Sequence, residues 1–208
     1  MSSILYYVHD PMCSWCWGFK PTLDKLLDEL PDSVQVHRIL GGLAPDSDQP
    51  MPEPMQQMLQ QTWQHIQSVI PETEFNYDFW TRNQPRRSTW PSCRAVLAAR
   101  RQDAALEVPM ILAIQRAYYL DARNPSDTQT LISIAEETGC DAGQFSEYLH
   151  SEAAHKELEA ERQMAHQLQV QGFPSLVYRN ARDQLFSIPV NYRQTVSMLE
   201  QITQANAA

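Results

Sequence analysis

The sequence predicts an α/β protein in which a long helical block separates two strand-containing ends. Short runs rich in β-branched and aromatic residues lie near the two ends of the chain, at residues 4–9, 34–40, 174–178 and 184–188. Between residues 55 and 171, apolar residues mostly recur at helical spacing instead. Because the strands are confined to the two ends, the helical middle is interpreted as an insertion into an α/β domain.

The N-terminal end has the pattern of a βαβ unit. Residues 4–9 predict a strand, and residues 13–30 predict a helix whose apolar positions roughly follow helical spacing. Residues 34–40, Val-Gln-Val-His-Arg-Ile-Leu, alternate into a second strand. Since a helix connects these two strands, we expect them to pair in parallel. A polar, proline-rich linker follows at residues 44–54.

The middle of the chain predicts helices joined by short breaks. The stretch 72–84 is ambiguous because its aromatic residues are separated by polar ones, and it is interpreted as a loop. Its aromatic rings either line a groove over the first helix or pack between two domains. The expected helices cover residues 55–70, 88–102, 106–120, 127–138, 142–150 and 152–171.

The C-terminal end predicts two strands at residues 174–178 and 184–188, joined by a hairpin-sized gap, and a helix at 191–204. The resulting order is βαβ, a helical block and ββα, which indicates a thioredoxin fold interrupted by an all-helical domain. The expected boundaries follow from this order. The thioredoxin-like domain comprises residues 1–48 and 160–208, and the inserted helical domain comprises residues 49–159.

Cysteines 13 and 16 form a CxxC motif, Cys13-Ser14-Trp15-Cys16, between the first predicted strand and the first predicted helix. A helix start presents unpaired backbone N–H groups and the positive end of the helix dipole, and both favour a thiolate. Cys13 is therefore the expected nucleophile. Cys16, one turn deeper, is placed to attack a mixed disulfide on Cys13 and to release the product.

The CxxC motif also occurs in zinc sites and in structural disulfides. Zinc needs two further ligands, but Cys93 and Cys140 are isolated, and the sequence contains no second CxxC motif. We therefore interpret the motif as redox-active, and we expect neither a metal nor an organic cofactor. Cys93 is either a third thiol facing the motif or a buried apolar side chain, and Cys140 is interpreted as structural.

The composition is that of a globular protein, with 208 residues, 43% hydrophobic and 20% charged. A net charge of −9 argues against nucleic acids and anionic membranes as partners, because both attract clustered Lys and Arg. The N-terminus has no basic segment or cleavable apolar segment, so we expect a cytoplasmic location. In that reducing compartment a CxxC motif is more commonly catalytic than a permanent cross-link.

Three segments carry a family resemblance: residues 10–19 (Asp-Pro-Met-Cys-Ser-Trp-Cys-Trp-Gly-Phe), residues 41–43 (Gly-Gly-Leu) and residues 172–177 (Gly-Phe-Pro-Ser-Leu-Val). With these segments the chain resembles the DsbA-like thioredoxin superfamily, in particular its FrnE-like cytoplasmic branch of predicted protein-disulfide isomerases. The resemblance covers nearly the whole chain. It implies a thiol–disulfide oxidoreductase or isomerase of the DsbA family that exchanges disulfides with protein or peptide thiols, or with glutathione.

The resemblance also implies residue roles. In this superfamily a cis proline lies opposite the CxxC motif, and Pro174 matches that position, so Phe173 and Pro174 are expected to bind substrate. Trp15 and Ser14 are expected to contact substrate as well. Strongly oxidising DsbA proteins carry a histidine between their cysteines, whereas this chain carries Ser14 and Trp15. We therefore expect reductase or isomerase chemistry instead of net oxidation.

Two other interpretations stay open. The inserted thioredoxin architecture is shared by 2-hydroxychromene-2-carboxylate isomerases and kappa-class glutathione transferases, so a glutathione-dependent small-molecule enzyme is the alternative. Those enzymes typically have a serine at the position of Cys13 and lack the second cysteine. A non-enzymatic interaction module is the third interpretation. The sequence leaves the physiological substrate, the recycling partner and the oligomeric state, monomer or homodimer, undetermined.

Overall fold

The structure is a computed structural model that describes residues 2–207. The chain forms two compact units. The first unit contains the residues up to Gly41 together with those from Glu161 onward, and the second contains Gly42–Ala160. It stays a prediction that residues 1–48 with 160–208 form the thioredoxin-like domain and residues 49–159 form the inserted domain.

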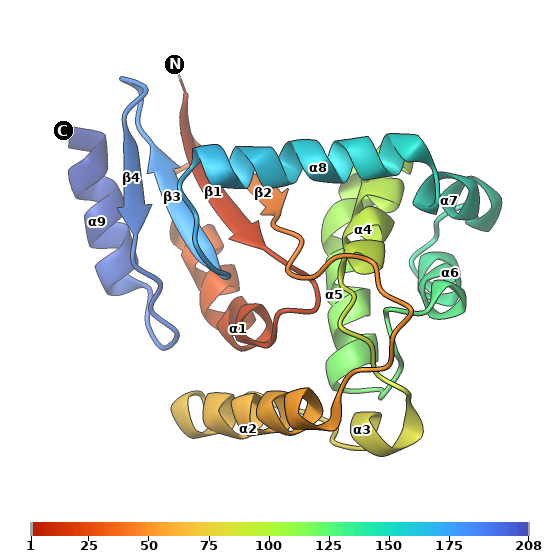
Figure 1. Ribbon diagram of the computed structural model, residues 1–208. Helices are drawn as coiled ribbons and strands as arrows, with labels where there is room; N and C mark the ends of the chain where they lie inside the picture. Colours follow the sequence, from red (N-terminus) through yellow and green to blue (C-terminus); the bar gives the residue numbers. More distant parts are fainter. Residues whose placement is uncertain (1, 208) are drawn as a thin grey trace. The chain divides into compact units, whose positions relative to one another are not determined.

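The first unit is built on a four-stranded sheet with the order β2-β1-β3-β4 (Figure 1). Strand β1 pairs with β2 in parallel and with β3 in antiparallel orientation, and β3 pairs with β4 in antiparallel orientation. This sheet confirms the predicted α/β class. The strands are β1 (Ser3–His9), β2 (Val34–Leu40), β3 (Ser175–Arg179) and β4 (Leu185–Ile188).

Both faces of this sheet are covered by helices. On one face Leu5, Tyr7 and Tyr178 form a core with residues of α1 (Ser14–Glu29) and α9 (Val196–Ala207). On the other face the neighbouring strand residues pack against the C-terminal end of α8 (Glu152–Gln167), because successive strand residues point to opposite faces. Strand β1 is buried over its whole length, so its C-terminal end holds the start of α1 in a fixed place.

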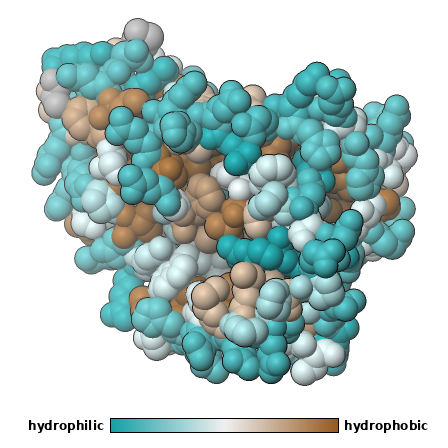
Figure 2. Space-filling model, viewed as in Figure 1, coloured by the Kyte–Doolittle hydropathy of each residue, from teal (hydrophilic) through white to brown (hydrophobic). Residues whose placement is uncertain are grey.

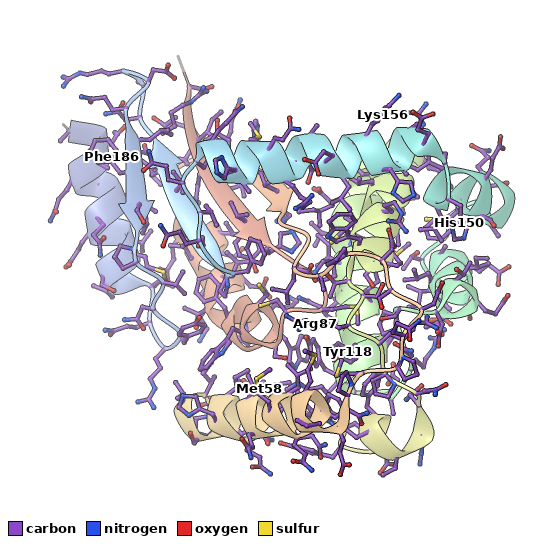
Figure 3. The ribbon with its side chains drawn as sticks, in the orientation of Figure 1. Met58, Arg87, Tyr118, His150, Lys156 and Phe186 are labelled. Atoms are coloured by element: carbon purple, nitrogen blue, oxygen red, sulfur yellow. The ribbon has the colours of Figure 1, made fainter. Side chains whose placement is uncertain are left out.

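The second unit is helical and contains a cluster of aromatic rings around Trp63, which is fully buried. Phe75 stacks on Trp63 with ring centroids 4.7 Å apart, and Tyr118, labelled in Figure 3, lies 5.7 Å from Trp63. The aromatic residues of the stretch 72–84 thus form a core inside this unit. Its elements are α2 (Glu53–Val69), α3 (Phe79–Arg82), α4 (Trp90–Gln102), the 3₁₀ turn Ala104–Leu106, α5 (Glu107–Tyr119), α6 (Thr128–Glu137), α7 (Ala142–Leu149) and the first part of α8.

The main differences from the sequence-based expectation concern the stretch 72–84, the end of α8 and the start of α9. The predicted loop 72–84 contains one helical turn, α3. Helix α8 ends at Gln167 instead of 171, because Gln169 adopts a φ of 58° and the Val170 amide donates to the Ala165 carbonyl, which closes the helix end. Helix α9 begins at Val196 instead of 191, because the Asn191 side chain accepts from the amides of residues 193 and 194 and forms a turn.

On the face drawn in Figure 2 the surface is largely hydrophilic, with apolar side chains showing between polar ones. Within residues 2–207, none of the helices combines the length and the apolar character that crossing a membrane requires.

Candidate active site

The first turn of α1 positions the two cysteines. Cys13 is the N-cap residue of α1, in an extended conformation, and its carbonyl accepts the Trp17 amide at 3.1 Å. The preceding turn is fixed by Asp10, whose carbonyl accepts the Cys13 amide and whose side chain accepts the Met12 amide at 2.8 Å. Cys13 therefore lies at the positive end of the helix dipole. Its side chain makes no capping hydrogen bond within the helix.

Cys16 lies one helical turn further along and is completely buried. Burial raises the pKa of the Cys16 thiol well above its usual value, and the hydrogen bond from Cys16 to Cys13 raises it further. A backbone hydrogen bond from Asp10 to the Cys16 sulfur acts in the opposite direction. The two thiols thus lie one helical turn apart in different environments. Both cysteines are free thiols.

The loop before β3 contacts the Cys13 sulfur. The Phe173–Pro174 peptide bond is cis, and the Cys13 thiol donates a hydrogen bond to the Phe173 carbonyl, with the sulfur and oxygen 3.5 Å apart. Pro174 is buried and Phe173 is half-buried. The structure therefore brings together Cys13, Cys16, Phe173 and Pro174, which the sequence singled out from two ends of the chain.

Trp15 lies between the cysteines and contacts Tyr192, with ring centroids 4.9 Å apart. Trp15, Ser14 and Tyr192 are all half-buried. Tyr192 is held in place because its carbonyl accepts the Thr22 hydroxyl at 2.8 Å. Burial, followed by the nearby charges of the two cysteines, raises the pKa of Tyr192 to about 12, so its hydroxyl stays protonated. Two neutral aromatic rings thus lie beside the dithiol.

Tyr7 and His9, both in β1, lie near the dithiol. The sequence gives no signal that Tyr7 belongs to the site. Tyr7 is buried, and this burial, followed by the neighbouring charges of Cys16 and Cys13, raises the pKa of its hydroxyl well above the usual value. His9 stacks on Tyr7 with ring centroids 4.8 Å apart, and neither ring nitrogen of His9 has a hydrogen-bond partner. Burial and the charge of Arg38 lower the pKa of His9 to about 3. His9 is therefore a neutral packing residue at physiological pH.

The other two cysteines belong to the helical unit. Cys93 is completely buried on α4. Cys140 is buried beside the Thr138 hydroxyl, and burial raises the pKa of its thiol. Among residues 2–207, no three side chains of His, Cys, Asp and Glu gather in a way that could hold a metal ion. Chemically, the described site offers two thiols one helical turn apart, a carbonyl acceptor beside the first of them, and two aromatic rings.

A family model described as thioredoxin matches residues 6–201 of the chain. The chain belongs to this thioredoxin family. Its thioredoxin fold is of the DsbA-like kind, as solved structures of similar architecture show. A candidate protein disulfide isomerase from Nitrosomonas europaea has a TM-score of 0.85 and 24% identity, covering 98% of this chain and 97% of that chain.

A second solved thioredoxin-fold protein is the cytosolic disulfide reductase DsbM from Pseudomonas aeruginosa. It has a TM-score of 0.77 and 23% identity, covering 99% of this chain and 100% of that chain. A structure of DsbM with GSH has a TM-score of 0.72 and 25% identity, covering 98% of this chain and 96% of that chain.

Curated relatives of this thioredoxin-family chain include the ClpXP adapter protein SpxH. The Bacillus subtilis protein is 24% identical over 194 residues, which are 92% of this chain and 64% of the relative. The Halalkalibacterium halodurans protein is 26% identical over 179 residues, 85% of this chain and 58% of the relative. The chain thus spans less than two thirds of the length of these two relatives.

Proposed function

We propose that this chain is a cytoplasmic thiol–disulfide oxidoreductase in which Cys13 and Cys16 are the catalytic residues. One observation carries the proposal: the Cys13 sulfur lies 3.5 Å from the carbonyl of Phe173, beside cis Pro174, and the buried Cys16 lies one helical turn further along α1. A metal site would need further ligands, and a structural disulfide would need no carbonyl acceptor beside one of its sulfurs. The likeness to DsbM supports the same chemistry and the cytoplasmic location.

The reaction follows from the two sulfur environments. The Cys13 thiolate attacks one sulfur of a substrate disulfide, so a bond forms between Cys13 and the substrate and one substrate thiolate leaves. The Cys16 sulfur then attacks Cys13. The Cys13–Cys16 disulfide forms, the second substrate sulfur leaves with the electron pair, and the proton from Cys16 ends on the released thiol. The substrate gains two electrons, and the dithiol loses them.

Phe173, Pro174, Trp15 and Ser14 are proposed to bind the substrate. The Phe173 carbonyl, 3.5 Å from the Cys13 sulfur, is the proposed acceptor for a substrate backbone N–H group. Trp15 and Tyr192 provide an apolar contact surface next to the dithiol. The proposed substrates are therefore disulfides with apolar or aromatic neighbours in proteins and peptides, and small disulfides of the glutathione class. The complex of DsbM with GSH supports the second group.

The proposed direction is reduction or isomerisation. The dipeptide between the cysteines, Ser14-Trp15, contains no histidine to stabilise the reduced form. We expect a reduction potential clearly below the roughly −120 mV of DsbA and nearer the values of about −180 to −270 mV of isomerases and thioredoxin. Equilibration of the purified protein with glutathione redox buffers measures this potential. A value as oxidising as that of DsbA would contradict the proposed direction.

The exchange reaction itself is tested by trapping. Cys16→Ser removes the resolving sulfur, so substrates should stay bound to Cys13 as mixed disulfides that a reductant releases. Cys13→Ser is the matched control and should trap nothing. Mass spectrometry identifies the trapped thiols and separates glutathione from proteins. If Cys16→Ser traps no more protein or small thiol than Cys13→Ser, the exchange function is wrong.

Two alternative functions make different predictions: a glutathione-dependent small-molecule enzyme and an adapter protein. A glutathione-dependent isomerase or transferase acting on a small molecule predicts that the protein binds reduced glutathione and turns over without Cys16. An adapter role is favoured by the SpxH relatives, and it predicts that Cys13→Ser leaves the cellular phenotype intact. Complementation of a deletion strain with Cys13→Ser and Cys16→Ser variants distinguishes the exchange function from both.

A further inference from the structure

A carboxylate on helix α8 holds the end of strand β2. The Glu161 side chain accepts the Leu40 amide, with Oε2 and the nitrogen 2.6 Å apart. Leu40 is the last residue of β2 and is buried, and Glu161 is half-buried. An ionised carboxylate is a stronger acceptor than a neutral carbonyl. The end of β2 is therefore fixed by a helix as well as by the neighbouring strand.

Helix α8 reaches the same region a second time, one turn further along. Ala165 follows Glu161 by four residues, and side chains at this spacing lie on one face of a helix. Ala165 is buried in the cluster that contains Ile39, and Phe173 packs against this cluster. One face of α8 thus borders both the end of β2 and the apolar residues that support Phe173.

Gly41, the residue after Leu40, connects this contact to Phe173. The Gly41 amide donates to the His9 carbonyl at 2.7 Å. A β-carbon at Gly41 would overlap the Phe173 ring, so the ring lies directly against the Gly41 backbone. Because Leu40 and Gly41 share a planar peptide unit, a shift of Leu40 moves Gly41 with it.

Phe173 in turn connects Gly41 to the nucleophile. Its ring lies on Gly41, and its carbonyl lies 3.5 Å from the Cys13 sulfur. That carbonyl is also the proposed acceptor for a substrate backbone N–H group. Each step from Glu161 to the carbonyl is thus a hydrogen bond, a peptide unit or a packing contact, and all of these residues belong to the first unit.

We propose that Glu161 is a positioning residue that, through the end of β2, holds the Phe173 carbonyl where an extended peptide disulfide can donate to it. This inference rests on the proposed exchange function. No proton or electron passes through Glu161. Its role is substrate preference, because a peptide uses the Phe173 carbonyl and a disulfide without N–H groups does not.

The test compares two disulfides, an extended peptide disulfide and dithiobis(nitrobenzoate), which has no N–H group. Stopped-flow mixing with the reduced protein gives a second-order rate constant for each, and their ratio measures the preference for the peptide. Glu161→Ala removes the acceptor, and Glu161→Gln retains an oxygen acceptor for the Leu40 amide. Glu152→Ala is the matched control on the same helix, because the Glu152 side chain is 82% exposed and pairs only with Lys156 among the printed ion pairs of α8.

We expect Glu161→Ala to lower the ratio about fivefold or more, because the peptide loses a well-placed hydrogen bond to the protein. Glu161→Gln should keep the ratio within about twofold of the wild type, and so should Glu152→Ala. A merely structural role for Glu161 would slow both reactions by the same factor. An unchanged ratio in Glu161→Ala, or an equal loss in either of the other two variants, would overturn the proposal.

A backbone variant covers the case in which Glu161→Ala does not fold. The α-hydroxy acid analogue of leucine at position 40 lacks the N–H donor but keeps the Leu40 side chain and the Glu161 carboxylate. The same fall in the ratio is expected, and an unchanged ratio would contradict the role of Glu161. If the wild-type protein reacts with neither disulfide, the exchange function fails. If it reacts with both and the variants keep its ratio, only the role of Glu161 is wrong.

Discussion

The ring of Phe173 lies in the space that a side chain at Gly41 would need. A β-carbon at Gly41 would come within 2.0 Å of the Phe173 ring. Gly41 follows β2, and its amide donates to the His9 carbonyl at 2.7 Å, so the end of β1 and the loop carrying Pro174 meet at this glycine. The missing side chain allows the Phe173 carbonyl to lie beside Cys13.

Gly41→Ala should therefore reduce exchange activity without changing either cysteine. The methyl group must displace the Phe173 ring, and overpacking of this kind costs about 1–3 kcal/mol. A shift of about 1 Å in a substrate-positioning group can lower a rate by about a hundredfold, so we expect at least a tenfold loss of disulfide reductase activity.

Gly172→Ala is the control for this prediction. It lies next to Phe173, but a β-carbon there would have no heavy atom within 4 Å. Turnover of a peptide disulfide by both variants measures the difference. Equal activities would show that the position of the Phe173 ring is unimportant for exchange.

His9→Phe should change the acid stability of the protein. The pKa of His9 is lowered from 6.5 to about 3 in the folded state, mainly by burial. Below pH 6.5 the unfolded chain binds a proton at this residue and the folded chain does not, so folding loses stability as the pH falls from 6.5 toward 3. The slope from this one group is at most about 1.4 kcal/mol per pH unit.

Denaturant unfolding at a series of pH values measures this effect. Wild type and His9→Phe should diverge below pH 6.5, with the variant losing less stability. His155→Gln, at an exposed histidine, should follow the wild type. Parallel curves for the wild type and His9→Phe would mean that His9 does not stay neutral in the folded protein.

The sequence predicts the site residues that are neighbours in the chain, but not the residues that the fold brings to them from elsewhere. A CxxC motif between a strand and a helix places two cysteines in one turn, so the sequence predicts Cys13 and Cys16 directly. Pro174 is predictable only through the family resemblance, because few X-Pro bonds are cis. Tyr7 looked like an ordinary strand residue, and Tyr192 lay in a predicted helix that the structure replaces with a turn. Their roles depend on packing between the two ends of the chain.

Cys13 should react with iodoacetamide at least about tenfold faster than Cys140 at neutral pH, because the two thiols differ in environment and not in exposure. Cys13 is 6% exposed and Cys140 is 7% exposed. Cys13 lies at the N-terminal end of α1, next to the positive end of the helix dipole, whereas burial raises the pKa of Cys140. Peptide mapping after timed alkylation measures both rates. Similar rates would indicate that the helix start does not activate Cys13.

Asp46→Ala should destabilise the helical unit through Arg94. Arg94 is 3% exposed and pairs with both oxygens of Asp46 at 2.8 and 2.9 Å, while its Nε donates to the Leu149 carbonyl. Removing the carboxylate leaves a buried guanidinium without its counter-charge. Because Asp46 itself is partly exposed, we expect a loss of about 1–3 kcal/mol.

Asp78→Ala is the comparison for Asp46→Ala. It breaks the Asp78–Arg82 ion pair, in which both side chains are more than half exposed, and should cost less than about 0.5 kcal/mol. Chemical denaturation of the two variants gives both values. If the two substitutions cost the same, burial of Arg94 adds nothing to the strength of its pair.

The hydrogen bond from the Cys13 thiol to the Phe173 carbonyl depends on the protonation state of Cys13. A thiol can donate to a carbonyl, but a thiolate has no proton to donate. The Phe173 oxygen is therefore occupied by the protein's own sulfhydryl only while Cys13 is protonated. In the proposed exchange reaction, ionisation of Cys13 would both create the attacking sulfur and free the Phe173 carbonyl to accept from an incoming peptide backbone. Formation of the nucleophile and opening of the peptide-binding position would then be the same event.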